Sequence, residues 1–243
     1  MKILGVIPAR YDSSRFPGKP LVDIMGKTMI QRVVEQVQKC TLVDEVIVAT
    51  DDERIAENVL SSGGNVIMTG KNHRSGTDRI GEVLEKLTAE GKFFDVVVNI
   101  QGDEPFIDPK QIEEVLSLFN NPEVQIATLA KKITSDEEIN NPNVVKLVFG
   151  NSAQALYFSR SPIPYLRNKT DEATYFKHIG MYAYKAEILR QLVMLEPTPL
   201  EQAESLEQLR WLENGYKIYV HITEFESIAV DTPEDLKKLT NNP

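Results

Sequence analysis

Cysteine is nearly absent from this sequence, because Cys40 is the single cysteine among 243 residues. One thiol cannot form an intrachain disulfide, and it cannot supply a zinc site built on several cysteines. The sequence also lacks any apolar run that approaches the length of a membrane-spanning helix, about 20 residues. The short apolar stretch at the N-terminus is followed at once by Arg10, which argues against a secretory signal. We therefore expect a cytoplasmic protein that does not insert into a membrane.

Two phosphate-binding motifs are also missing. No predicted strand is followed by G-x-G-x-x-G, which disfavours a dinucleotide fold and a nicotinamide oxidoreductase, and there is no G-x-x-x-x-G-K-[ST]. Basic charge is scarce as well: 27 Lys and Arg face 36 Asp and Glu, a net charge of −9, so we expect no nucleic-acid partner. Residues 1–40, with seven basic and three acidic residues, are nevertheless cationic. That excess indicates either a small anionic ligand or a chance distribution.

The first half of the chain alternates short apolar runs with amphipathic segments. Strands alternating with helices predict an α/β fold with a mostly parallel sheet covered by helices on both faces. The predicted strands are Ile3–Ile7, Val46–Ala49, Val66–Met68 and Val96–Ile100, and the helical spacings fall in 29–37, 55–60, 80–87 and 112–119.

The second half is less regular. The leucine stripe from Leu200 to Leu212 predicts one core-packed helix that ends at Asn214 and Gly215, and Thr232 predicts the N-cap of a last helix. We expect a single domain (1–243) with a core at 1–130 and 216–243, and an insertion at 131–215 that supplies part of the site and a dimer surface. Strands are predicted at Val124–Ala130, Val144–Val148, Tyr216–His221 and Ile228–Val230, with an antiparallel ribbon from Ala155–Phe158 and Ile179–Tyr184.

Ligands of open α/β sheets bind beyond the carboxyl ends of the strands, so the residues there are the candidates. The loop after the first strand carries Arg10, Arg15 and Lys19, cations suited to a polyphosphate; the alternative is an ordinary solvated loop. Asp103 and Asp231 each follow a predicted strand and are expected at the same edge of the sheet. Two such carboxylates could hold Mg²⁺ together with substrate phosphates. The alternatives are an acidic helix start at Asp103 and a capping carboxylate at Asp231.

Other polar residues carry weaker signals. Ser75 and Gly76 could present backbone and hydroxyl groups to a base, although Thr77 with Asp78 is also typical of a plain helix N-cap. A lone histidine such as His178 is more often structural. Glu207 and Gln208 fall between the apolar positions of the leucine stripe, which by this pattern places them toward solvent.

Eight segments, taken in order, resemble the family of 3-deoxy-manno-octulosonate cytidylyltransferases, the CMP-Kdo synthetases, over essentially the whole chain. They are Ile7–Leu21 (IPARYDSSRFPGKPL), Val48–Asp52 (VATDD), Ser75–Arg79 (SGTDR), Asn99–Pro105 (NIQGDEP), Ala155–Arg160 (ALYFSR), Lys177–Tyr184 (KHIGMYAY), Glu204–Arg210 (ESLEQLR) and Val230–Leu236 (VDTPEDL).

The resemblance implies a Rossmann-like nucleotide-diphospho-sugar transferase fold with a smaller insertion subdomain, and a homodimer in the cytoplasm. It implies a Mg²⁺-dependent transfer of CMP from CTP to 3-deoxy-manno-octulosonate (Kdo), which activates the sugar for lipopolysaccharide synthesis. It also implies that Arg10, Arg15 and Lys19 hold the triphosphate, that Pro8, Ala9, Ser75, Gly76, Arg79 and Gln101 line the cytidine, that Asp103 and Asp231 bind Mg²⁺, and that Arg160, His178, Glu207 and Gln208 contact Kdo.

Three alternatives stay open beside this interpretation. A CMP-sialic acid synthetase or another sugar-nucleotide pyrophosphorylase is the nearest, and a close analogue of Kdo could replace Kdo as the substrate. A non-catalytic nucleotide-binding regulator on the same fold is a third, but it would be expected to lack Asp103 or Asp231, and both are present.

Overall fold

The structure, a computed structural model, describes residues 1–12, 16–168, 173–226, 229–230 and 232–236. The chain folds into two compact units. The first comprises Met1–Glu113, Lys185–Val193 and Glu226–Pro243, and the second comprises Glu114–Tyr184 and Met194–Phe225. These ranges differ from the expected core and insertion, because the strands over 126–132 and 218–222 pair with each other inside the second unit.

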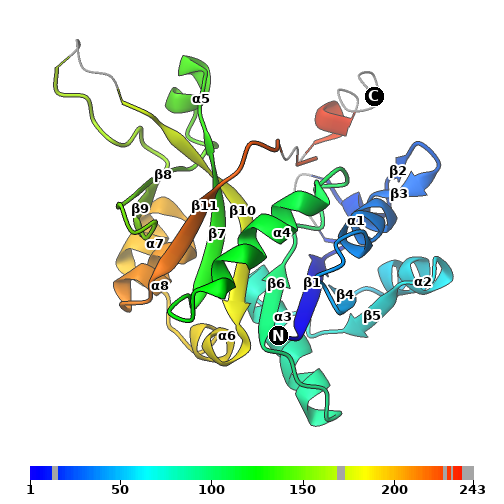
Figure 1. The fold of residues 1–243 in the computed structure, drawn as a ribbon. Coiled ribbons are helices and arrows are strands. Elements are labelled where there is room, and N and C mark those ends of the chain that lie inside the picture. The colour runs from blue at the N-terminus through cyan, green and yellow to red at the C-terminus, as the bar shows by residue number, and fades with distance from the viewer. Residues whose placement is uncertain (13–15, 169–172, 227–228, 231, 237–243) are drawn as a thin grey trace. The chain divides into compact units, whose positions relative to one another are not determined.

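The first unit is built on a parallel sheet whose strands lie in the order β6-β1-β4-β5 (Figure 1). Their β-branched and leucine side chains are buried on β1, β4 and β6, which is why these segments appear in the sequence as short continuous apolar runs. The four strands expected in the first half are confirmed, as β1 (Ile3–Ala9), β4 (Glu45–Thr50), β5 (Asn65–Met68) and β6 (Val96–Asn99).

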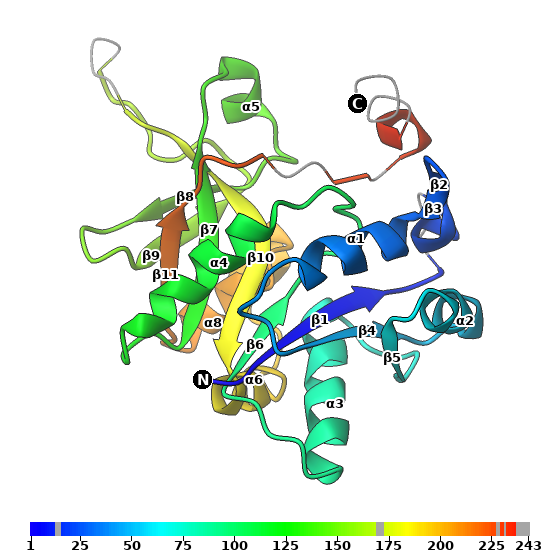
Figure 2. The same ribbon diagram turned by 45° about the vertical axis from the view of Figure 1, so that its right-hand side comes forward.

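Helices connect these strands and cover the sheet. Thr28 begins α1 with a capping box, and the buried face of α1 is the one that the helical spacing predicts. Figure 2 shows α1 and α3 on opposite sides of β1, so the sheet is covered on both faces as expected. The helices of this unit are α1 (Met29–Gln38), α2 (Glu53–Ser61), α3 (Gly76–Ala89) and α6 (Ala186–Leu192), with α4 (Pro109–Ser117) running into the second unit.

The strand order reverses between β1 and β6. The chain leaves β1 toward β4 and β5, and then returns through α3 to β6 on the other side of β1. Such a reversal separates the loops at the carboxyl ends of the two strands, which is where ligands of open α/β sheets bind. The loop after β1 leads into η1 (Lys19–Leu21) and the hairpin of β2 (Asp23–Ile24) and β3 (Lys27–Thr28).

The second unit has a mixed sheet. Strand β11 is parallel to β7, β10 is antiparallel to β7, and β8 pairs with both β10 and β9. Both strands of the predicted antiparallel ribbon are found, but they do not pair with each other: Ala155–Phe158 pairs with β8, and Ile179–Tyr184 pairs with β7. The elements are η2 (Leu118–Asn120), β7 (Ile126–Lys132), α5 (Asp136–Asn140), β8 (Lys146–Phe149), β9 (Ala155–Ser159), β10 (Phe176–Lys185), α7 (Pro199–Glu204), α8 (Gln208–Glu213) and β11 (Ile218–Ile222).

The single helix predicted from the leucine stripe is wrong. Ser205 has a left-handed conformation with a φ of 52°, which ends α7 before α8 begins. A residue in this conformation cannot continue a right-handed helix. Consequently Leu200 is 40% exposed, whereas Leu206 and Leu209 are buried.

The strand predicted over Ile228–Val230 is not found in the part of it that the structure describes, since Ala229 and Val230 are irregular and Ile228 lies outside the described residues. The helix after it is confirmed. The Thr232 hydroxyl accepts a hydrogen bond from the Asp235 amide at 3.3 Å, and residues 233–236 are helical. Among the described residues, no helix is long and apolar enough to cross a bilayer.

Candidate functional site

Lys19 and Asp103 form an ion pair between the loops that follow β1 and β6. The Lys19 Nζ lies 2.8 Å from the Asp103 Oδ2, and the two side chains are 14% and 26% exposed. The structure thus brings together one residue expected to hold the triphosphate and one expected to bind a metal. The alternative of an acidic helix start at Asp103 is wrong, because Asp103 lies in a turn and α4 begins only at Pro109.

Two further predicted residues, Arg15 and Asp231, lie outside the described residues. Val230, which the structure describes, contacts the turn that carries Asp103. The Val230 amide donates a hydrogen bond to the Asp103 carbonyl at 2.9 Å, and Val230 is buried against Ile24 and Met29. The chain therefore passes Asp103 at Val230.

Two glycines allow the backbone to close around Pro8. A Cβ on Gly102 would lie 2.7 Å from the Pro8 carbonyl oxygen, a distance that real Cβ atoms do not show. A Cβ on Gly76 would lie 3.4 Å from the Pro8 Cγ. The end of β1, the residues after β6 and the start of α3 consequently meet, which brings Pro8, Gly76 and the region of Gln101 together as the resemblance implies.

Ser75 is the N-cap of α3. Its Oγ accepts a hydrogen bond from the Asp78 amide at 3.1 Å, and the helix begins at Gly76. The prediction of Thr77 as the cap is therefore wrong, and Thr77 is a buried residue inside the first turn. The first amides of a helix lack intrahelical partners, so Ser75 and Gly76 place hydrogen-bond donors beside Pro8.

Arg79 is a buried cation that holds α3 in place. Its side chain is 1% exposed, its Nη2 lies 3.1 Å from the Asp51 Oδ2, and its Nη1 donates to the Thr69 Oγ1. Asp51 follows β4 and Thr69 follows β5. Arg79 therefore ties the first turn of α3 to the ends of two neighbouring strands.

Tyr11, for which the sequence predicted no role, supports the loop after β1. The Arg54 guanidinium stacks over the Tyr11 ring at 3.3 Å from its centroid, and the Gly18 amide donates to the Tyr11 carbonyl at 2.9 Å. Of the neighbouring predicted residues, Ala9 is buried and Arg10 is exposed. An aromatic residue within a polar, cationic loop was the feature of the sequence that could have indicated this supporting role of Tyr11.

His178, in the second unit, is a neutral imidazole. Its Nε2 lies 3.0 Å from the Thr128 Oγ1, and the Thr128 hydroxyl is also 2.8 Å from the Met181 carbonyl. Since the hydroxyl has one proton, which it donates to the carbonyl, we assign the imidazole proton to Nε2 and leave Nδ1 as an acceptor. Burial lowers the pKa of His178 to about 3.

An irregular strand pairing creates the partners of His178. The register between β10 and β7 shifts between Ile179 and Tyr182, which face Leu129 and Thr128, so two residues of β10 are inserted at this point. Such a bulge leaves backbone groups without ladder bonds. The Thr128 hydroxyl satisfies the Met181 carbonyl and thereby fixes His178 as well.

The other residues expected to contact Kdo lie around the break between α7 and α8. The Arg160 Nε donates to the Glu204 carbonyl at 2.7 Å, and its Nη1 donates to the Pro142 carbonyl at 3.0 Å. Glu207 immediately precedes α8 and is partly buried. Gln208 is only 6% exposed, so the expectation from the leucine stripe that it faces solvent is wrong.

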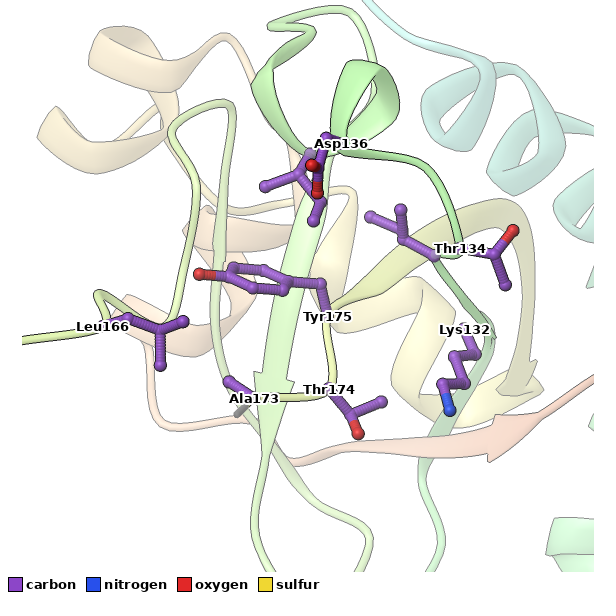
Figure 3. A pocket seen from close by; sticks show the side chains of 9 residues that line it. Lys132, Thr134, Asp136, Leu166, Ala173, Thr174 and Tyr175 are labelled. Atoms are coloured by element: carbon purple, nitrogen blue, oxygen red, sulfur yellow. The ribbon is translucent and has the colours of Figure 1, made fainter. Parts of the chain in front are cut away.

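A cavity of about 600 Å³ opens elsewhere in the second unit (Figure 3). None of the predicted site residues that the structure describes lines it. Its walls combine the end of β7, the start of α5 and the chain before β10, with Lys132, Asp136, Leu166 and Tyr175 among the lining residues.

Comparisons with known proteins agree with the resemblance. The chain matches the cytidylyltransferase family over residues 4–218. The 3-deoxy-manno-octulosonate cytidylyltransferases of Bacteroides thetaiotaomicron and Parabacteroides distasonis are 55% and 54% identical to it, each over 98% of this chain and 96% of the relative.

Solved structures give the same result. A CMP:2-keto-3-deoxy-manno-octonic acid synthetase complexed with CTP is similar with a TM-score of 0.93 and 46% identity, over 99% of this chain and 98% of that chain. A putative glucose-1-phosphate thymidylyltransferase from Bacillus anthracis shares the fold alone, with a TM-score of 0.67 and 16% identity over 98% of this chain and 94% of that chain. The predicted nucleotide-diphospho-sugar transferase fold is confirmed.

Proposed function

The chain belongs to the cytidylyltransferase family, and from this membership we propose that it transfers CMP from CTP to Kdo and releases pyrophosphate. The observation that carries the proposal is the Lys19–Asp103 pair, at the ends of the two strands between which the strand order reverses. A cation there neutralises phosphate charge, and a carboxylate there can hold the metal that accompanies a triphosphate.

The chemistry needs no covalent intermediate with the protein. The anomeric hydroxyl oxygen of Kdo attacks the α-phosphorus of CTP in line and forms a new P–O bond. The bond from the α-phosphorus to its bridging oxygen breaks, pyrophosphate leaves with the electron pair, and the hydroxyl proton passes to solvent. Positioning and charge neutralisation dominate such transfers, which is the work we propose for Arg10, Arg15 and Lys19.

Mg²⁺ is the proposed cofactor, held by Asp103 and Asp231. Among the described residues, no group of three or more His, Cys, Asp or Glu is arranged as a metal site, but Mg²⁺ is commonly held by one or two carboxylates together with substrate phosphates. Asp103 fits this requirement, since its carboxylate already pairs with a cation, the Lys19 ammonium, and stays partly exposed. The ion would supply charge neutralisation at the triphosphate and would lower the pKa of the attacking hydroxyl.

Kdo contacts are proposed for Arg160, His178, Glu207 and Gln208. Kdo offers one carboxylate and several hydroxyls, so it requires both donors and acceptors. The neutral His178 supplies an acceptor at Nδ1, Gln208 supplies an amide that is nearly buried, and Arg160 supplies a cation anchored by backbone carbonyls.

The homodimer, the cytoplasmic location and the role in lipopolysaccharide synthesis are also part of this proposal. Light scattering on the purified protein tests the first: a mass of about twice the 27.4 kDa chain supports the dimer, and a mass equal to one chain contradicts it.

Pyrophosphate release across a substrate panel tests the activity. The protein is incubated with Mg²⁺, with CTP or UTP, and with Kdo, an amino-substituted Kdo analogue or N-acetylneuraminate. We expect the highest kcat/KM with CTP and Kdo. A higher value with N-acetylneuraminate would favour the CMP-sialic acid synthetase alternative, and no release with any pair would exclude the activity.

A further inference from the structure

Glu82 stands on the face of α3 that is turned toward the β5–α3 loop (residues 69–75). The Gly70 amide donates to its Oε2 at 2.8 Å, and the His73 Nε2 lies 2.5 Å from the same oxygen. The Lys86 ammonium lies 2.8 Å from its Oε1. One carboxylate therefore binds the loop at two points and its own helix at a third.

The contacts of Glu82 belong to a ladder along one face of α3. One turn earlier, the Asp78 Oδ2 accepts from the Arg74 amide at 3.2 Å, and one turn later the Lys86 ammonium donates to the Met68 carbonyl at 2.7 Å. Side chains four residues apart lie on the same face of a helix. This face holds the β5–α3 loop from the end of β5 to the cap of α3, and Glu82 is its central member.

The charge of Glu82 is stabilised by these contacts. Burial alone would raise its pKa, but the hydrogen bonds from Lys86, Gly70 and His73 outweigh burial and lower the pKa to about 2. An ionised carboxylate only accepts hydrogen bonds, so the His73 Nε2 carries a proton directed at Glu82. The side chain of Glu82 is 26% exposed, less than half the exposure of Glu85 on the same helix. Solvent therefore screens the interaction of Glu82 with His73 less than that of Glu85 with Arg190.

The loop that Glu82 holds ends at the residues expected to line the cytidine. Ser75 closes the loop as the N-cap of α3, and Gly76 approaches Pro8. Two anchors fix the two ends of this segment: Arg79 fixes Thr69, and the Ser75 cap fixes the start of the helix. Between them, Gly70 and His73 are held by Glu82.

We propose that Glu82 is a positioning residue for the nucleotide: it fixes the β5–α3 loop through Gly70 and His73, so that Ser75 and Gly76 meet the base of CTP in one conformation. The inference rests on the proposed function, which places the cytidine at Ser75 and Gly76. Glu82 itself does not contact the substrate. Its effect is therefore on the binding of CTP rather than on the binding of Kdo.

Glu82→Gln tests the inference because it keeps the shape and removes the charge. We expect the KM for CTP to rise about tenfold, with kcat within about twofold of the unchanged protein and the KM for Kdo unchanged, since the loss of uniform binding raises KM alone. Glu82→Asp retains the charge but shortens the side chain, and a weaker response than that of Glu82→Gln is expected. A CTP KM that does not change, or equal changes in the two KM values, would overturn the proposal.

Glu85→Gln is the matched control. Glu85 lies on α3 and pairs with Arg190 at 2.6 Å, so this variant removes a carboxylate of the same helix without touching the β5–α3 loop. We expect its KM for CTP to equal that of the unchanged protein. A rise as large as that of Glu82→Gln would show that any charge loss on α3 has the same effect, and would overturn the assignment to Glu82.

Calorimetric titration with CTP separates this inference from the proposed activity. If the unchanged protein binds CTP but releases no pyrophosphate with Kdo, the proposed activity fails, while weaker CTP binding in Glu82→Gln would still support the role of Glu82. If Glu82→Gln does not fold, His73→Asn removes one contact alone; CTP binding weakened by about threefold supports the proposal, and unchanged binding overturns it.

Discussion

The candidate nucleotide residues of the first unit and the candidate sugar residues of the second are built in different ways. In the first unit they follow regular strands, and glycines let the ends of those strands close together around Pro8. In the second unit they depend on irregular backbone: a bulge beside His178 and a left-handed Ser205 between α7 and α8. Regular elements can be recognised from periodicity, whereas these irregularities follow from tertiary packing and cannot. Substitutions in the two units should therefore have different measurable effects.

The largest effect is expected for Asp103→Asn. This change removes a proposed metal ligand and the partner of Lys19, and kcat should fall by on the order of 10²–10³-fold, the loss typical of removing one preorganised charge-stabilising group. Pyrophosphate release at saturating CTP, Kdo and Mg²⁺ measures it. The melting temperature should change little, because the carboxylate is partly exposed. Near-normal turnover would remove Asp103 from the site.

Lys19→Ala should have the next largest effect. A hydrogen bond to a charged group contributes about 1.5–3 kcal/mol, so kcat/KM for CTP should fall by about 10- to 150-fold. Lys27→Ala is the control. Lys27 lies in the same cationic segment, residues 1–40, but it pairs with the exposed Glu35. Equal activities of the two variants would contradict the role of Lys19 and remove the contrast between site cations and surface cations.

Gly102→Ala tests the close approach to Pro8. The added Cβ would meet the Pro8 carbonyl oxygen, and overpacking of this kind costs about 1–3 kcal/mol. Gly150→Ala is the matched control in the second unit, since a Cβ there meets nothing within 4 Å. Urea denaturation should show a lower free energy of unfolding for Gly102→Ala only. Unchanged stability of Gly102→Ala would mean that the strand ends do not need this contact.

The smallest effect at neutral pH is expected at His178, which acts on stability only as the pH falls. Its folded pKa of about 3 lies below the ordinary value, so the unfolded chain binds a proton that the folded chain does not. This group therefore lowers the free energy of unfolding as the pH falls from about 6.5 to about 3. His178→Gln should show a shallower decline in urea denaturation over that window. Identical declines would contradict the neutral state of His178.

The sequence predicts the regular elements of this protein well and the irregular backbone poorly. The apolar runs predict β1 and β6, and with them the position of Lys19 and Asp103 at the ends of parallel strands. The leucine stripe, in contrast, predicts one helix where Ser205 separates two, because serine carries no strong local signal for a left-handed conformation.

The cap of α3 shows a further limit. Ser75 and Thr77 are both common N-cap residues, so local preference alone could not choose between them. The structure selects Ser75, and Gly76 then becomes the helical residue that lies against Pro8. The neutral state of His178 also escaped prediction, because its cause is burial among side chains distant in the sequence, such as Phe158. Roles in the second unit therefore came from the resemblance rather than from local pattern.

Hydrogen exchange with CTP alone, without Kdo, tests the central claim most directly. The account predicts slower amide exchange at the carboxyl ends of β1 and β6 and at the start of α3, around Pro8, Asp103 and Gly76, with little change at His178 and Gln208. Slower exchange confined to the second unit, with none at the strand ends of the first, would contradict it.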